Sequence, residues 1–281
     1  MHFRSTPRGA DLLLPELFHF ELFGRTLSVN GYGLMIGIGL VLWTWLVGKE
    51  ARRLGLVSLQ ERTTSTLLVF IAALFVGGKG LYLLTLLGER APDADDFQYG
   101  FVFYGGLLTA APVMAWQSRR LGLGVLQGLD IFALPAPLAH AFGRLGCFLA
   151  GCCYGHRCSL PWAVRFEHGR GLNGVFVHPV QLYESLGLLA LFAVLWFFLR
   201  PRKRFDGQIL FTYFLGYAAL RCVTELFRGD PDRRILFADS PASPGDPPHG
   251  IPLSTMIALV TALLCLLALF WLRRRPSPPA S

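Results

Sequence analysis

Seven long apolar segments constrain the fold of this chain more than any other feature. Each has the 17–25 residues or so that a helix needs to cross a bilayer. They lie at about residues 30–48, 64–88, 100–117, 130–152, 180–199, 207–227 and 252–272. Only 16% of the 281 residues are charged, whereas a soluble domain has about 25%. The sequence therefore predicts an all-α integral membrane protein of about seven transmembrane helices.

Basic residues gather in four clusters between these segments. The clusters are Lys49, Arg52, Arg53 and Arg62; Arg119 and Arg120; Arg200, Arg202, Lys203 and Arg204; and Arg273, Arg274 and Arg275. All four fall on one side of a seven-span chain, and cytoplasmic loops carry such an excess of Lys and Arg. The N-terminus is therefore expected outside and the C-terminus in the cytoplasm. The net charge of +8 is explained by orientation, and no nucleic-acid partner is expected.

Residues 1–281 are expected to form one polytopic membrane domain. Its two long extracytoplasmic loops, 153–179 and 228–251, exceed the length of a turn. The first contains three aromatic residues among polar ones, which predicts a small outward-facing cap or an interfacial element. The second is rich in proline and serine, which is typical of a flexible loop. The first span is expected to remain as an anchor, because no cleavable signal peptide is evident before it.

Arg144 lies in the glycine-rich run 143–155 of the fourth segment. A charged side chain within a membrane is costly unless it faces the protein interior or a wet cavity. His140, Arg144, Cys147 and Gly151 share a narrow arc of one helix face. A tight helix-packing face with a snorkelling arginine would give the same pattern. Because Arg144 lies about eight residues from the outer end of the segment, we interpret it as a functional residue.

The sixth segment places Tyr217, Arg221, Glu225 and Arg228 within an arc of about 80°. A structural ion pair would explain Arg221 and Glu225 alone. Arg228 leaves an excess of positive charge on this face, which favours binding of an anion. The planar guanidinium group matches the geometry of phosphate oxygens. Arginines from two helices therefore predict a phosphate-binding site near the outer surface.

The run from His178 to Glu184 opens the fifth segment, and its Pro179 suits the first turn of a helix. Gln181 and Glu184 share one helix face. The run is either a well-formed helix start or a set of polar groups directed towards the same outer cavity.

Sequence motifs occur in a fixed order along most of the chain. They are Tyr32–Met35, Gly105–Leu107, Gly143–Gly146, His178–Glu184, Gly216–Arg221, Glu225–Arg228 and Pro231-Asp232. The ordered set, over roughly residues 28–275, resembles the prolipoprotein diacylglyceryl transferase family of bacterial inner membranes.

This resemblance implies an enzyme that moves a diacylglyceryl group from phosphatidylglycerol to the lipobox cysteine thiol of a prolipoprotein signal peptide. Glycerol phosphate is released in this first step of lipoprotein maturation. The implied protein is a multi-pass protein of the bacterial inner (cytoplasmic) membrane, surrounded by membrane lipids, with no cofactor and no metal. Arg144 and Arg221 match the family's essential arginines. The implied substrate-binding residues are Tyr32, Gly105, Gly106, Cys147, Gly155, His178, Gln181, Tyr217, Glu225 and Arg228.

Three positions depart from the family pattern. Cys147 stands where an asparagine is usual, and Cys152 where a glutamate is frequent. Tyr104 occupies the place of a histidine proposed as the general base in some members, so it is retained as a catalytic position. A tyrosine with a pKa near 10 is a poor base at neutral pH. His140 or His178 are alternatives, or the thiol loses its proton unaided.

The cysteines allow several interpretations. Cys147, Cys152, Cys153 and Cys158 would form a redox-active thiol pair, or a metal site with His156, although their spacing matches no zinc ribbon or CxxC motif. A structural disulfide to Cys158 on the oxidising outer side is favoured over both. Small apolar packing is expected of Cys147, Cys222 and Cys265.

Other functions remain open beside the transferase. A paralogue of this family would serve another acceptor or only bind lipid. An anion transporter would also place arginines on facing helices. A thiol–disulfide membrane protein would cycle Cys152 with Cys153 or Cys158. A transferase, unlike a transporter, predicts no continuous polar lining towards the cytoplasm.

Overall fold

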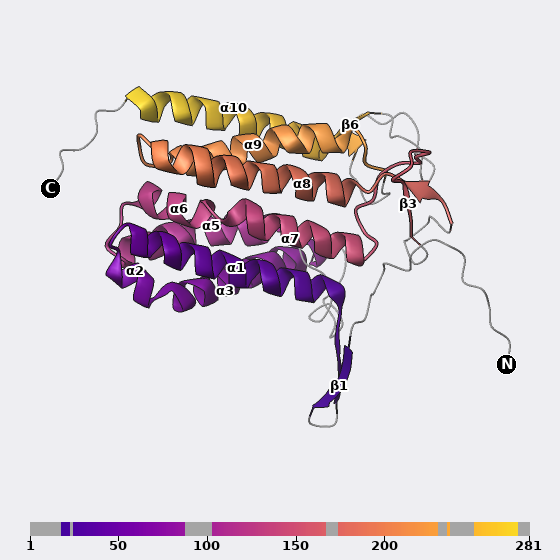
Figure 1. The fold of residues 1–281 in the computed structure, drawn as a ribbon, viewed down its shortest axis with the longest axis horizontal. Helices are drawn as coiled ribbons and strands as arrows, with labels where there is room; N and C mark the ends of the chain where they lie inside the picture. The colour runs from indigo at the N-terminus through magenta and orange to yellow at the C-terminus, as the bar shows by residue number, and fades with distance from the viewer. Residues whose placement is uncertain are drawn as a thin grey trace.

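The computed structural model describes residues 18–22, 25–87, 103–166, 174–229, 235–236 and 250–274. Most of these residues are helical, and the helices lie side by side along the long axis of the molecule (Figure 1). The helices are α1 (Gly31–Arg53), α2 (Val57–Glu61), α3 (Thr63–Leu86), α5 (Phe103–Arg120), α6 (Val125–Ala133), α7 (Ala136–Leu149), α8 (Val180–Ala193), the π-helical η1 (Val194–Leu199), the 3-10 helix η2 (Arg200–Arg202), α9 (Gln208–Glu225) and α10 (Leu253–Arg274). A helical segment occupies each of the seven apolar regions, which agrees with a mostly helical membrane protein.

Four of the described helical segments are long and apolar enough to cross a membrane: α1, α3, Val180–Arg202 and α10. The pair α6 and α7 makes a fifth if it forms one span, since the two helices meet at a bend of 42°. The fourth segment, predicted as one crossing over 130–152, therefore contains a bend between two helices. Pro135 lies at the break, and a proline both removes a backbone N–H and clashes with the preceding turn.

Close backbone contacts at glycines bring neighbouring helices together. A Cβ on Gly39 of α1 would lie 3.0 Å from the carbonyl oxygen of Ala139 in α7. A Cβ on Gly77 of α3 would overlap the carbonyl oxygen of Gly105 in α5. Such approaches need small residues at the helix interface. The pairs α1–α7, α3–α5, α7–α8 and α9–α10 are the most extensive packing partners among the described helices.

The described residues of the four basic clusters, which leave out Arg275, lie at one end of the bundle, where α10 ends (Figure 1). Contacts between segments far apart in sequence join this end. Glu50 of α1 pairs with Arg200, and Ser58 of α2 donates a hydrogen bond to the carbonyl oxygen of Leu121 after α5. A side chain on Gly207 would meet Leu272 near the end of α10.

The opposite end carries three small sheets, which the sequence did not predict in an all-α fold. Each is an antiparallel pair. The strands are β1 (Phe18–Leu22) with β2 (Arg25–Val29), β3 (Val164–Arg165) with β4 (Phe176–Val177), and β5 (Ile235–Leu236) with β6 (Ile251–Pro252). The hairpin β1–β2 leads directly into α1 (Figure 1). Most of the predicted flexible loop 228–251 lies outside the described residues.

The described part of loop 153–179 folds as a small cap around Phe166, which is 1% exposed. Tyr154 and Val177 are buried with it, and Phe148 of α7 packs edge-on against its ring. Trp162 and Phe176, by contrast, remain more than half exposed. The cap thus sits directly on the end of α7, beside the residues of the candidate site.

Candidate functional site

Three helices bring their polar residues to the same end of the bundle. Arg144 lies near the end of α7, Glu184 lies just after the start of α8, and Arg221 lies in the last turns of α9. The helix α8 packs against both α7 and α9. Because α8 runs in the opposite direction to the other two, its beginning meets their ends (Figure 1).

Glu184 is the centre of the site. Its Oε1 lies 2.9 Å from Nη2 of Arg144, and its Oε2 lies 3.7 Å from Nη1 of Arg221. Tyr217 of α9 donates a hydrogen bond of 3.0 Å to the same Oε1. We call Glu184, Arg144 and Arg221 the Glu184 cluster. Its carboxylate is 2% exposed, so two guanidinium groups from different helices converge on one buried anion.

The site retains a positive excess. Arg221 also pairs with Glu225 of α9, with 2.7 Å between Nη2 and Oε2. Arg228 follows α9 and is 8% exposed. Three guanidinium groups and two carboxylates therefore leave one positive charge uncompensated among these five residues. A buried positive excess is a favourable place for an anion.

Aromatic and imidazole side chains line the inner side of the cluster. Tyr217 accepts a hydrogen bond of 3.4 Å from Nη2 of Arg144. The ring of His140 packs against Tyr217 with 4.7 Å between centroids. His140 Nδ1 lies 3.2 Å from the hydroxyl of Tyr213. These contacts orient Tyr217 towards Arg144 and Glu184.

Gly155 closes the site by backbone contacts. It forms an isolated antiparallel bridge with Arg228, and its N–H donates to the carbonyl oxygen of His178. A Cβ at this position would lie 2.5 Å from Cβ of His178 and 2.6 Å from the carbonyl oxygen of Phe227. Only glycine lets the three segments approach this closely.

The structure corrects the expected position of Arg228. The sequence pattern placed it on the same helix face as Tyr217, Arg221 and Glu225. However, α9 ends at Glu225, and Arg228 lies in the bridge with Gly155. The N–H of Arg228 donates to the carbonyl oxygen of Glu225 at 3.3 Å, so the turn after α9 positions this residue.

His178 and Gln181 extend the site at the start of α8. His178 is 8% exposed, and its Nδ1 lies 3.1 Å from the hydroxyl of Tyr183. Burial, with the nearby His156 as the second cause, lowers the pKa of His178. Gln181 is 1% exposed and donates from Nε2 to the carbonyl oxygen of Cys152 at 2.7 Å.

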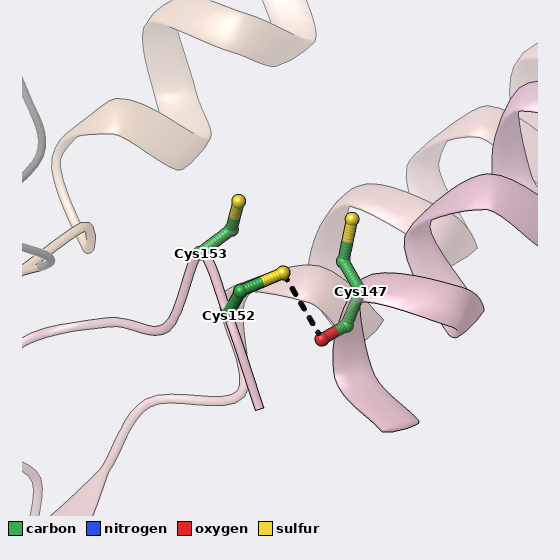
Figure 2. Close-up of side chains that lie close together, drawn as sticks. All are labelled: Cys147, Cys152 and Cys153. Atoms are coloured by element: carbon green, nitrogen blue, oxygen red, sulfur yellow. Dashed lines mark hydrogen bonds between the residues drawn. The ribbon is translucent and has the colours of Figure 1, made fainter. Parts of the chain in front are cut away.

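Cys147 lies with Cys152 and Cys153 in a group of three sulfur atoms within 4.8 Å of one another (Figure 2). We call these residues the thiol cluster. All six cysteines are free, so the expected disulfide to Cys158 is wrong in this structure. Tyr32, at the start of α1, lies against α7, since a side chain on Gly146 would meet its ring at 3.1 Å.

The remaining predicted residues lie elsewhere or cannot be placed. Gly105 packs against Gly77 and Leu81 of α3, where it allows close helix contact, and Gly106 is buried next to it. Tyr104 belongs to α5, but its side chain lies outside the described residues. The contacts of Gly105 therefore assign it to helix packing.

Sequence reasoning did not include Glu184 among the site residues. Its spacing from Gln181 pointed to a shared polar face, but nothing in the sequence alone identified the carboxylate that both arginines would contact. One available signal was charge balance, because a buried arginine needs an anionic partner, and Glu184 is the acidic residue of the His178–Glu184 motif.

Comparison with known proteins agrees with these observations. The family model described as "Prolipoprotein diacylglyceryl transferase" matches residues 18–271. A phosphatidylglycerol–prolipoprotein diacylglyceryl transferase of Clostridium tetani is 33% identical over 217 residues, which are 75% of this chain and 85% of the relative. One of Yersinia enterocolitica is 29% identical over 280 residues, covering 90% of this chain and 93% of the relative. The chain therefore belongs to the prolipoprotein diacylglyceryl transferase family.

Proposed function

We propose that this protein transfers the diacylglyceryl group of phosphatidylglycerol to the lipobox cysteine of a prolipoprotein. The single observation that carries the proposal is the convergence of Arg144 and Arg221, from two helices, on the buried Glu184. Relatives that carry this activity in their names match along most of the chain.

The Glu184 cluster retains donors for a lipid phosphate. Among the described residues, Nη1 of Arg221 is buried without a hydrogen-bond partner, because its distance of 3.7 Å to Glu184 exceeds hydrogen-bond length. Oε1 of Gln181 is likewise buried without a partner in the described part of the chain. A phosphate oxygen would accept from the guanidinium group, and a glycerol hydroxyl would donate to the amide oxygen.

The chemistry requires charge stabilisation at the leaving phosphate. The thiolate sulfur attacks the glyceryl carbon, a C–S bond forms, and the C–O bond to phosphate breaks. The electron pair of that bond remains on the phosphate oxygen, and glycerol phosphate leaves. Arg144 and Arg221 would stabilise this developing charge as preorganised donors. The thiol proton leaves to a base or to water.

Neighbouring residues would position the two arginines and the lipid headgroup relative to each other. Tyr217 and Glu225 orient the two arginines through the contacts described above. Arg228 would supply further positive charge to the glycerol phosphate. Tyr32 lies at the side of α7, where it would contact the headgroup. Tyr104 remains a proposed catalytic position.

The charge pattern supports a proposal for topology. We propose a single polytopic domain over residues 1–281 with seven spans in the bacterial inner membrane. The basic end would face the cytoplasm, and the Glu184 cluster and its cap would lie near the outer surface. The helices α5 and α9 would be the third and sixth spans and complete the seven, although Arg119, Arg120, Arg221 and Glu225 make them more polar than the others.

Packing below the site favours a lipid enzyme over an anion transporter. Between the Glu184 cluster and the basic end, Leu134, Leu195 and Ile209 are at most 3% exposed and pack with Leu46 and Trp196. An ion path would require polar groups in this region. This buried apolar layer therefore supports a site that opens only towards one side of the membrane.

Reconstitution tests the proposed activity directly. The purified protein is placed in vesicles containing phosphatidylglycerol with a synthetic lipobox peptide. The expected result is a peptide that gains the mass of one diacylglyceryl group at its cysteine. Vesicles without phosphatidylglycerol and a peptide with serine in place of the cysteine should give no product. A folded protein that yields no product, or that instead conducts anions across the vesicles, would refute the proposal.

A further inference from the structure

The thiol cluster is a group of potential metal ligands to which the transfer chemistry described above assigns no step. The Sγ atoms of Cys147, Cys152 and Cys153 all lie within 4.8 Å of one another. Cys147 belongs to the last turn of α7, and the other two follow the helix (Figure 2). Cys152 is exposed, so the group is accessible from outside, whereas the other two thiols are partly buried.

The backbone conformation after α7 places these sulfur atoms close together. Gly151 has φ +64°, and Cys153, with φ +61°, is the one non-glycine residue with positive φ in the described part of the chain. This left-handed conformation is unfavourable for a residue with a Cβ. It reverses the chain after α7, so that Cys153 returns towards Cys147.

Hydrogen bonds fix the reversed segment. The N–H of Cys152 donates to the carbonyl oxygen of Cys147 at 3.1 Å, and its thiol lies 3.6 Å from the same oxygen (Figure 2). Gln181 of α8 holds the carbonyl oxygen of Cys152 at 2.7 Å. The arrangement is therefore held by α7 and α8 and does not depend on the thiols alone.

We propose that Cys147, Cys152 and Cys153 bind one thiophilic d10 cation of the Zn²⁺ class. A zinc–sulfur bond of about 2.3 Å places neighbouring sulfur atoms about 4 Å apart, which agrees with the separation in the cluster. Three thiolates leave one tetrahedral position for water or another ligand. Soft thiolate ligands also select Zn²⁺ and its heavier congeners over Mg²⁺ and Ca²⁺.

Two arginines supply positive charge beside the thiol cluster. The charges of Arg228 and Arg144 interact with Cys153, and that of Arg144 interacts with Cys147. Binding of the ion releases the thiol protons. Three thiolates with a divalent cation carry one net negative charge, which these two arginines would balance.

Cadmium is a suitable probe because its thiolate complexes have a charge-transfer band in the ultraviolet. The full-length protein is reduced in detergent, freed of reductant and titrated with Cd²⁺. One equivalent should saturate the band, and Zn²⁺ should displace it. The combined variant Cys147→Ser, Cys152→Ser and Cys153→Ser should lose the band, and each single variant should bind at least tenfold more weakly.

The remaining cysteines provide a matched control. The combined variant Cys158→Ser, Cys222→Ser and Cys265→Ser keeps the thiol cluster and should bind Cd²⁺ as tightly as the parent protein. Circular dichroism and gel filtration show that each variant is folded. The proposal is overturned if the thiol-cluster variant still binds one Cd²⁺, if the control variant loses binding, or if the reduced parent protein shows no saturable band. The readout is metal binding, so it is independent of transfer activity.

Discussion

Two buried carboxylates at opposite ends of the bundle each contact two arginines, yet their geometry differs. Glu50 pairs with Arg53 of its own helix and with Arg200 of η2, and we call these three residues the Glu50 cluster. In the Glu184 cluster the two arginines come from helices other than that of the carboxylate. Both carboxylates are at most 4% exposed.

The Glu50 cluster has two short contacts from each arginine. Arg53 donates from Nε at 3.0 Å and from Nη2 at 2.6 Å. Arg200 donates from Nε at 2.6 Å, and its Nη2 also pairs with the carboxylate. The contacts of Arg53 are forked over both carboxylate oxygens, whereas both contacts of Arg200 go to Oε2, so each arginine makes two charge-assisted contacts with Glu50. The Glu50 cluster is therefore a structural tie between α1 and η2.

The Glu184 cluster has one contact from each arginine, and one of them is long. Arg144 pairs at 2.9 Å and Arg221 at 3.7 Å, while Nη1 of Arg221 has no hydrogen-bond partner among the described residues. Each arginine of the Glu50 cluster thus makes two short contacts with its carboxylate, whereas Arg221 of the Glu184 cluster keeps an N–H donor without a partner. Arginine beside a buried carboxylate occurs at both ends. The candidate site differs because one of its guanidinium donors has no hydrogen-bond partner.

The largest effect is expected from removing an arginine of the Glu184 cluster. Arg144→Ala or Arg221→Ala should lower the transfer rate by about 10²–10³-fold or more, since each loss removes a charged donor to the leaving phosphate. Arg53→Ala and Arg200→Ala, in the Glu50 cluster, should leave the rate within about threefold and lower the melting temperature. Transfer of the lipobox peptide in vesicles measures both. Equal losses of activity at the two ends would contradict the comparison.

The next effect is expected from neutralising the two carboxylates. Glu184→Gln should lower transfer by about tenfold to a hundredfold, because both arginines lose the anion that positions them. Glu50→Gln should preserve transfer, although each variant should lose about 1–3 kcal/mol of stability. Melting temperature and transfer rate are measured on the same preparations. If Glu50→Gln reduces transfer as much as Glu184→Gln, then stability alone explains the loss.

The sequence predicted the helical segments well, because membrane helices are specified by local composition. A run of apolar residues reveals α1, α3, α8 and α10 without any tertiary contact. The break between α6 and α7 lies at Pro135, but whether a proline bends or only perturbs a helix depends on its neighbours. The hairpin β1–β2 was not predicted, although Phe18–Leu22 alternates apolar and polar side chains, because strands of five residues are far too short to cross a membrane.

The site was harder to predict, because its contacts join residues far apart in the chain. Helical spacing placed Arg144 and Arg221 near one end, but Glu184 contacts them from a third helix, which no periodicity reveals. Arg228 was assigned to α9 because nothing local marks the end of that helix at Glu225. The thiol cluster depends on the left-handed conformation of Cys153, which the sequence does not indicate for a cysteine.

A smaller effect is expected at the backbone contact that closes the Glu184 cluster. Gly155→Ala should lower transfer by about tenfold, because its Cβ would overlap His178 and the carbonyl of Phe227 and displace the bridge to Arg228. Gly37→Ala is the matched control, since a Cβ there meets nothing within 4 Å. An alanine at Gly155 that leaves the transfer rate equal to that of Gly37→Ala would show that Arg228 need not be held by this bridge.

The smallest effect is expected in the pH dependence of the melting temperature, which should differ between variants at the two ends of the bundle. Burial, and then the charge of His156, lower the pKa of His178 below its usual 6.5, so the folded protein binds fewer protons here than the unfolded chain does near pH 6. Stability therefore rises with pH through this range and falls as the pH drops below 6.5 towards the folded pKa. The melting temperature should decrease less between pH 7.5 and 5.5 in His178→Gln than in the parent protein. A variant at the Glu50 cluster, such as Arg53→Ala, should keep the parent's dependence on pH, because it leaves His178, His156 and Tyr183 unchanged. If His178→Gln shows the same decrease as the parent, protonation of this residue does not contribute to the stability of the end that carries the cap.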